Sequence, residues 1–186
     1  MDNKSFEQAV LCSVAGGYRL CGTVLASQDG LPLRVDYEIG CDDQWRTKAC
    51  VVEQQYGAAR KTSVVRVEAD RWLVNGAHRV ALDGCTDVDL GVSPSTNTLA
   101  INRLMLGRGE KQQIRAAWVK FPELEVEAAE QLYECCQDGR YIYRSLSSGF
   151  KAAITTDECG LPIVYEGVWE RVAATVVENY QSPSAL

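Results

Sequence analysis

The stretch Gly84–Leu106, GCTDVDLGVSPSTNTLAINRLML, combines acidic, turn-forming and apolar residues more densely than any other part of the chain. If its first part is extended, Asp87 and Asp89 leave the same face of a strand, because side chains alternate between faces. Val88 and Leu90 then point the other way. Half of this short strand is therefore expected to be core.

A short helix is predicted directly after this strand. Pro94 and its neighbouring serines interrupt the strand, and one of the polar residues at 95–97 can cap a helix over about Thr98–Met105. Apolar side chains surround most of this segment: Leu99, Ile101, Leu104, Met105 and Leu106. A helix that is apolar on most sides has to be enclosed by other structure. We therefore expect it at the centre of the fold.

The rest of the chain has the pattern of short strands joined by tight turns. Alternating apolar and polar residues over 33–39, and the turn sequences Asp29-Gly30 and Asn75-Gly76, predict hairpins before the central stretch. Further strands are expected near 113–121, 140–145, 149–156, 161–165 and 168–177. The segment Glu123–Cys136 is ambiguous, because its Glu and Ala residues favour a helix. Strands at intervals of about 8 to 12 residues indicate a barrel, roll or sandwich.

Length and charge restrict the function classes. The 186 residues fit one domain, and the formal charge of −6 disfavours nucleic acid and anionic membrane surfaces as partners. The sequence opens with no signal-peptide pattern and holds no run of about 18 apolar residues, so no transmembrane segment and a cytoplasmic location are expected. The eight cysteines include no Cys-x-x-Cys, and His78 is the single histidine. We expect reduced structural cysteines, no metal site and no cofactor.

The central stretch resembles the signature of the putative glycolipid-binding family of small bacterial proteins. The shared features are an Asp-x-Asp pair, a Pro, an Asn-Thr-Leu and an Arg-Leu in this order. Other positions resemble the family as well: Cys41-Asp42-x-x-Trp45-Arg46, Gln131-x-Tyr133, Tyr141-x-Tyr143, Asp157-x-x-Gly160, Tyr165 and Trp169-x-Arg171-Val172.

The resemblance spans roughly residues 16–172 and implies a definite fold. That fold is mostly β, a single-domain antiparallel spiral β-roll wrapped around one central helix. It also implies that 123–136 is extended and that the protein is a homodimer. We expect one domain over residues 1–186, with a core of about 16–177 and a tail at 178–186. Strand edges at Ser63–Ala69 and Ile114–Phe121, which lack a protecting proline, are also consistent with a dimer.

The acid pair admits two interpretations. Asp87 and Asp89 could act as general acid and base or bind a divalent ion. The structural interpretation, which we favour, is that they accept hydrogen bonds from the amides of 95–98 and pair with Arg103. No Gly-x-Ser-x-Gly or competent nucleophile accompanies them.

Aromatic residues on the predicted strands are the better ligand candidates, because alternate positions line one face of a sheet. Together with the family resemblance they predict a non-catalytic lipid- or glycolipid-binding protein for a neutral or weakly polar amphiphile. The alternative is a hydrolase or lyase that uses Asp87 and Asp89. We expect Trp45, Trp72, Tyr143 and Trp169 to take the apolar part of the ligand, and Asn97 or Arg171 to reach its head group.

Overall fold

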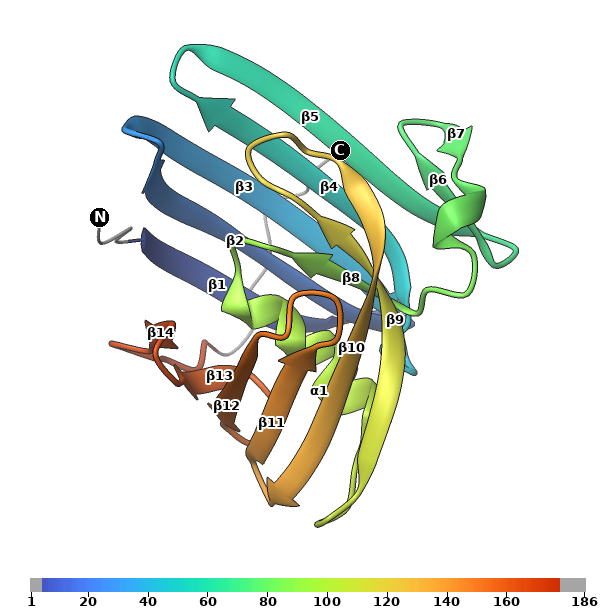
Figure 1. Cartoon of the computed structure of the whole chain (residues 1–186), viewed down its shortest axis with the longest axis vertical. Coiled ribbons are helices and arrows are strands. Elements are labelled where there is room, and N and C mark those ends of the chain that lie inside the picture. Colours follow the sequence, from blue (N-terminus) through green and yellow to red (C-terminus); the bar gives the residue numbers. More distant parts are fainter. Residues whose placement is uncertain (1–4, 178–186) are drawn as a thin grey trace.

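Two seven-stranded β-sheets make up most of the protein in the computed structural model, which describes residues 5–177. The predicted tail at 178–186 lies outside the described residues. The first sheet is a meander in chain order (Figure 1): β1 (Ser5–Val14), β2 (Gly17–Gln28), β3 (Leu31–Asp42), β4 (Thr47–Tyr56), β5 (Ala59–Glu68), β6 (Arg71–Val74) and β7 (Ala77–His78).

The second sheet has the order β14-β13-β12-β11-β10-β9-β8. Its strands are β8 (Asp87–Leu90), β9 (Lys111–Val119), β10 (Val126–Gln137), β11 (Arg140–Ser145), β12 (Lys151–Thr156), β13 (Pro162–Tyr165) and β14 (Trp169–Glu170). The ambiguous segment is thus a strand, β10. Short 3-10 helices precede and follow β8: η1 (Val80–Leu82) and η2 (Pro94–Thr96).

Local sequence explains most of these strands. In β3 the alternate residues Leu33, Val35, Tyr37, Ile39 and Cys41 are buried, whereas the residues between them are exposed or half-buried. The turn Asn75-Gly76 has positive φ at both positions, 51° and 81°, as a two-residue hairpin of the mirror-image type requires. Alternation and turn chemistry therefore agree over the first sheet.

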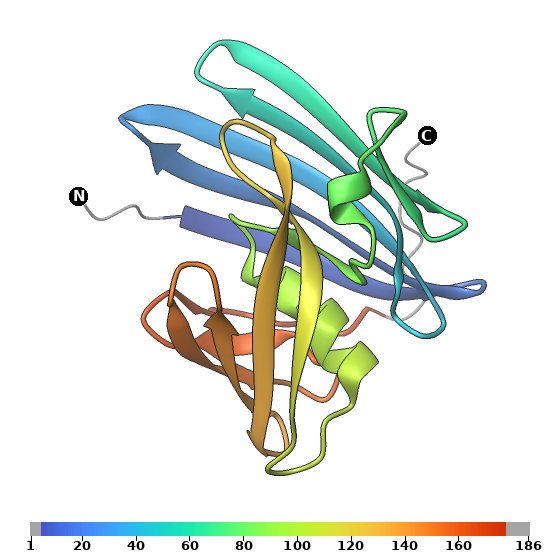
Figure 2. The same cartoon turned by 45° about the vertical axis from the view of Figure 1, so that its right-hand side comes forward.

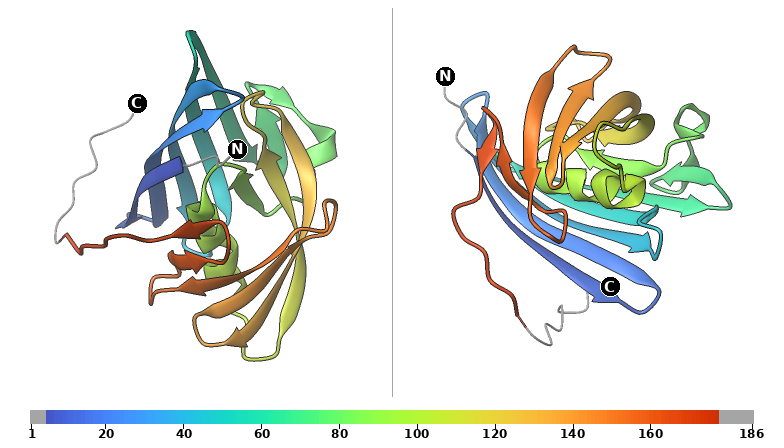
Figure 3. Two further views of the ribbon diagram at one scale, coloured as in Figure 1. Left: turned by 60° about the vertical axis from the view of Figure 1, so that its left-hand side comes forward. Right: turned by 90° about the horizontal axis from the view of Figure 1, so that it is seen from below.

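The central stretch crosses between the two sheets. The single α-helix described, α1 (Asn97–Leu104), follows η2 and connects β8 to β9, which pair in parallel. Parallel neighbours need a crossover connection, commonly a helix, and α1 provides it. Figures 2 and 3 show α1 in the space between the sheets. The fold is thus mostly β, a roll-like arrangement around one helix, as predicted.

The helix separates two apolar clusters. Leu99 belongs to the larger one, where Val88 and Leu90 pack against the first sheet and Trp72 is 1% exposed. Ala100 and Ile101 belong to the smaller one with residues of the second sheet: Ile114, Tyr133, Tyr143, Ala152, Ile154 and Tyr165. The enclosure predicted for the helix is confirmed up to Ile101. Met105 is 83% exposed, because the chain leaves the helix there in a left-handed conformation.

The predicted strand edges are wrong. β5 pairs with β4 and, over Val65–Glu68, with β6, while β9 lies between β8 and β10. The outer strands of the described sheets are instead β1 and β7 in the first and β8 and β14 in the second. Within residues 5–177, no helix is long and apolar enough to cross a membrane.

Candidate functional site

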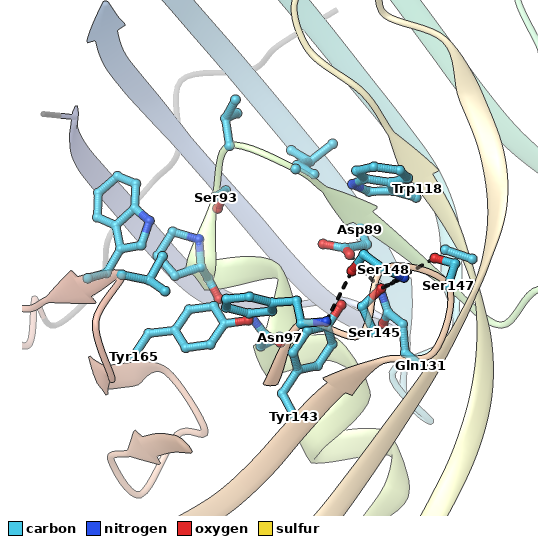
Figure 4. Close-up of a pocket in the computed structure, with 18 residues that line it drawn as sticks. Asp89, Ser93, Asn97, Trp118, Gln131, Tyr143, Ser145, Ser147, Ser148 and Tyr165 are labelled. Atoms are coloured by element: carbon cyan, nitrogen blue, oxygen red, sulfur yellow. Dashed lines mark hydrogen bonds between the residues drawn. The ribbon is translucent and has the colours of Figure 1, made fainter. Parts of the chain in front are cut away.

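A cavity of about 330 Å³ lies between the start of α1 and the second sheet. Residues of six strands, of the β8–α1 connection, of the first position of α1 and of the β11–β12 and β13–β14 loops line it. Figure 4 shows Asp89 and Trp118 on one side and Tyr143 and Tyr165 on another. Ser145, at the end of β11, lies opposite Gln131 in the β10–β11 pairing.

Asp89 supplies the acidic group of this cavity. It is half-buried, and its carboxylate accepts hydrogen bonds from the Thr96 hydroxyl at 2.9 Å and from the Gln131 amide at 2.6 Å. Burial raises the pKa of Asp89 above its ordinary value of 3.8, and the nearby Asp87 carboxylate adds to the increase, while the two hydrogen bonds oppose it. Asp89 is therefore a positioned acceptor held at the cavity wall.

Three tyrosines of the second sheet differ in what their hydroxyls contact. Tyr133 donates to the side-chain oxygen of Asn97 at 2.8 Å and is 2% exposed. Tyr143 and Tyr165 line the cavity, and within residues 5–177 neither hydroxyl has a hydrogen-bond partner. Their rings meet edge to face, with centroids 6.2 Å apart. Burial first, and then the Asp89 charge, raises the pKa of Tyr143, so it remains a neutral donor.

Trp118 lies opposite Asp89 in the β8–β9 pairing and also lines the cavity. A methyl group on Gly91 would come within 2.8 Å of the Trp118 indole nitrogen. Glycine is thus needed at position 91 for the indole to sit where it does. The indole N–H has no partner among the described residues.

Asp87 faces a different environment from Asp89. Its two oxygens accept hydrogen bonds from Arg103 at 2.9 and 2.6 Å, and it is 2% exposed. Thr86 also donates to it at 2.6 Å. Arg103 pairs with Asp87, as the structural interpretation proposed, but Asp89 bonds to Thr96 and Gln131 instead. The acid pair is therefore divided between an internal ion pair and a cavity wall.

A second carboxylate cluster was not predicted from the sequence. Glu7 on β1 accepts hydrogen bonds from the hydroxyls of Ser93, of Ser95 at 2.8 Å and of Tyr37 at 2.7 Å. Burial raises the pKa of Glu7 above its ordinary value of 4.5, and these hydrogen bonds oppose the increase. Since Ser93 and Pro94 also line the cavity, the cluster fixes one part of its wall to the first sheet.

The ligand candidates from the sequence occupy different places. Asn97, Tyr143 and Trp169 line the cavity. Trp72 lies in the core, where its indole donates to the Cys85 carbonyl at 3.1 Å. Two others also have protein partners outside the cavity: Trp45 stacks on Tyr18 with ring centroids 3.8 Å apart, and Arg171 forms an ion pair with Asp157 at 2.7 Å.

Several lining residues were not proposed from the sequence, notably Trp118, Gln131 and Tyr165. Trp118 and Tyr165 lie within the strands predicted near 113–121 and 161–165, and Gln131 is at a position that resembles the family. Nothing in the sequence orders them around one cavity. No cluster of three or more metal-ligand side chains occurs within the described residues.

Comparison with known proteins gives a family and a similar crystal structure. A family model described as putative glycolipid-binding matches residues 1–171. The chain belongs to this family. It is also similar to a DUF1089-family protein from Pseudomonas aeruginosa known from a crystal structure, with 30% sequence identity and a TM-score of 0.82, over 91% of this chain and 92% of that one. No curated protein matches the sequence.

The putative glycolipid-binding family is thus represented here by a roll with a defined cavity. The signature stretch contributes twice: Asp87 and Arg103 form the internal ion pair, whereas Asp89, Pro94 and Asn97 form one wall of the cavity.

Proposed function

We propose that this protein binds an amphiphilic lipid whose polar part carries no negative charge, and that the cavity at Asp89 is the binding site. One observation carries the proposal. The described residues that line the cavity include five aromatic rings, one acid and no Lys, Arg or His. Aromatic walls bind apolar surface, and a few placed polar groups orient a ligand.

The charge of the lining determines which ligands are disfavoured. A phosphate or carboxylate in this cavity would meet the Asp89 carboxyl in a poorly hydrated place, with no cationic side chain in the lining to balance it. Membership of a family described as putative glycolipid-binding supports a binding role. The uncharged amphiphile predicted from the sequence is therefore retained.

A hydrolase or lyase that uses Asp87 and Asp89 was the alternative. Such a site needs both carboxylates to reach one substrate. Asp87 is bonded to Arg103 and does not line the cavity, so only Asp89 is presented. The geometry accordingly favours binding over acid–base catalysis by this pair.

Native mass spectrometry of the purified protein tests the proposal. We expect a co-purified species that is lost on solvent extraction, and saturable binding when the extracted protein is titrated with lipids and glycolipids. The expected dissociation constants are below about 100 micromolar, which corresponds to roughly 5.5 kcal/mol. The absence of both a bound species and saturable binding would contradict the proposed function.

The homodimer and the cytoplasmic location remain predictions from the sequence. β8 is an outer strand without an open edge, because its Val88 and Leu90 amides donate to the Thr47 and Thr96 hydroxyls in the interior. The edges available for association are therefore those of β1, β7 and β14. We expect light scattering at micromolar concentration to give about twice the chain mass of 20.5 kDa. A single species at 20.5 kDa would count against the dimer.

A further inference from the structure

The cavity wall contains polar groups that the protein leaves without partners. The hydroxyls of Tyr143 and Tyr165 and the indole N–H of Trp118 belong to residues that line the cavity, and none has a hydrogen-bond partner within residues 5–177. Within residues 5–177, each oxygen of Asp89 accepts one side-chain hydrogen bond, although a carboxylate offers about four acceptor positions. The wall thus provides several donors and at least one strong acceptor.

These groups make the cavity unsuitable for an acyl chain. A hydrocarbon would displace water from the donors and give them no new hydrogen bond. Each polar group left unpaired in this way lowers affinity by about 5- to 150-fold. Hydroxylated ligands avoid this cost, because a hydroxyl can both accept from Tyr143, Tyr165 or Trp118 and donate to Asp89.

We propose that the cavity holds the hydroxylated head group of the ligand, an uncharged ring of sugar size, and that the apolar chain leaves over Phe150 and Val168. The inference rests on the proposed function, since it takes this cavity as the ligand site. Phe150 is 42% exposed and Val168 is 46% exposed, although both line the cavity, so they form an apolar mouth. The volume of about 330 Å³ lies at the small end of ligand sites, which suits one ring better than a ring with its chain.

The residues of the wall then have separate roles. Asp89 accepts from ring hydroxyls, and Gln131 and Thr96 act as positioning residues that hold its carboxylate. Tyr143 and Trp118 donate to ring oxygens, and their aromatic surfaces pack against the C–H face of the ring. The assignment differs from the one made from the sequence, in which the aromatic residues take the apolar chain.

An organic cation is the competing ligand class. Asp89 and the surrounding aromatic rings would attract an ammonium group. An ammonium group has no acceptor, however, so it would leave the tyrosine and tryptophan donors unpaired. The unpartnered donors therefore favour a neutral polyol.

Four octyl compounds that share one chain and differ in the head group test this inference by calorimetric titration below their micellar concentrations. They are octyl glucoside, octanol, octyl phosphate and octyltrimethylammonium. We expect octyl glucoside to bind at least about 10-fold more tightly than each of the others, as the gain of two or more hydrogen bonds predicts.

Equal binding of octyl glucoside and octanol would overturn the head-group assignment and leave the proposed function standing. Tightest binding of the phosphate or the ammonium compound would also overturn it, and no binding of any compound would contradict the proposed function itself.

Tyr143→Phe tests the role of a single donor. Its hydroxyl has no protein partner among the described residues, so we expect an unchanged melting temperature, a loss of about 2- to 10-fold in octyl glucoside affinity and no change for octanol. Tyr18→Phe is the matched control, because the Tyr18 hydroxyl also lacks a partner within residues 5–177 and lies outside the lining. Tyr165→Phe is the second test variant if Tyr143→Phe fails to fold. Unchanged octyl glucoside binding, or an equal loss for both compounds, would overturn the inference.

Discussion

Asp87→Ala is expected to lower the free energy of unfolding by about 3–5 kcal/mol, because it leaves the largely buried guanidinium of Arg103 without its partner. Asp87 is 2% exposed, and the Arg103 side chain is 13% exposed. The loss corresponds to a fall in melting temperature of roughly 6–20 °C for a chain of this size. Urea unfolding followed by circular dichroism measures it.

Two further variants make this test specific. In the double variant Asp87→Ala with Arg103→Met, no unpaired charge remains, so we expect part of the stability to return. Glu127→Ala removes the acid from the surface Lys120–Glu127 pair, whose side chains are 30% and 51% exposed, and should leave the urea midpoint nearly unchanged. If Asp87→Ala behaved like Glu127→Ala, the ion pair would not be holding the central stretch in place.

Most strands of the fold could be predicted because their signals are local. Alternation in β3 and the Asn75-Gly76 turn depend on residues that are adjacent in the chain. The pairing partners of a strand are not encoded locally, which is why β5 and β9 were taken for edges. The parallel pairing of β8 with β9 was not foreseen for the same reason, although the helix that makes it possible was.

For the site as well, the sequence predicts which residues lie on strands but not what each of them contacts. A tryptophan on a strand can pack into the core, like Trp72, or line a cavity, like Trp118, and the alternation of the strand does not distinguish these outcomes. Which of the two environments a tryptophan has depends on the residues that pack against it from other segments of the chain. Gly91, in the β8–α1 connection, lies beside the Trp118 indole and leaves room for it, whereas the Trp72 indole donates to the Cys85 carbonyl. Arg171 donates a hydrogen bond to Asp157, 14 residues earlier in the chain, and does not line the cavity.

The Glu7 cluster is the part of the molecule that sequence reasoning could least reach. Ser93 and Ser95 lie 86 and 88 residues from Glu7, and Tyr37 lies 30 residues away. β1 pairs along its length with β2 only. The four side chains therefore join the outer strand of the first sheet to the connection that precedes α1.

Glu7→Ala is expected to cost about 2–4 kcal/mol of unfolding free energy at neutral pH, because the hydroxyls of three buried residues lose their common acceptor. Glu7→Gln keeps an acceptor oxygen of similar reach and should cost less. Hydrogen exchange is expected to rise first in β1 and near Ser93, since the cluster connects these two segments. Faster exchange spread evenly over both sheets would contradict the connecting role.

The pH dependence of the same variants tests the charge of Glu7. Its pKa in the folded protein is raised above 4.5, so the folded state binds more protons than the unfolded state between that value and the raised pKa. The contribution of Glu7 to stability must then increase as pH falls through this window, which is opposite to the behaviour of an ion-paired acid. Asp89 also has a raised pKa, but it is present in both proteins and cancels in their difference. We therefore expect the unfolding free energy of the native protein minus that of Glu7→Gln to grow as the pH falls from neutrality towards 4.5. A difference that stays constant or shrinks would show that the pKa of Glu7 is not raised in the folded protein.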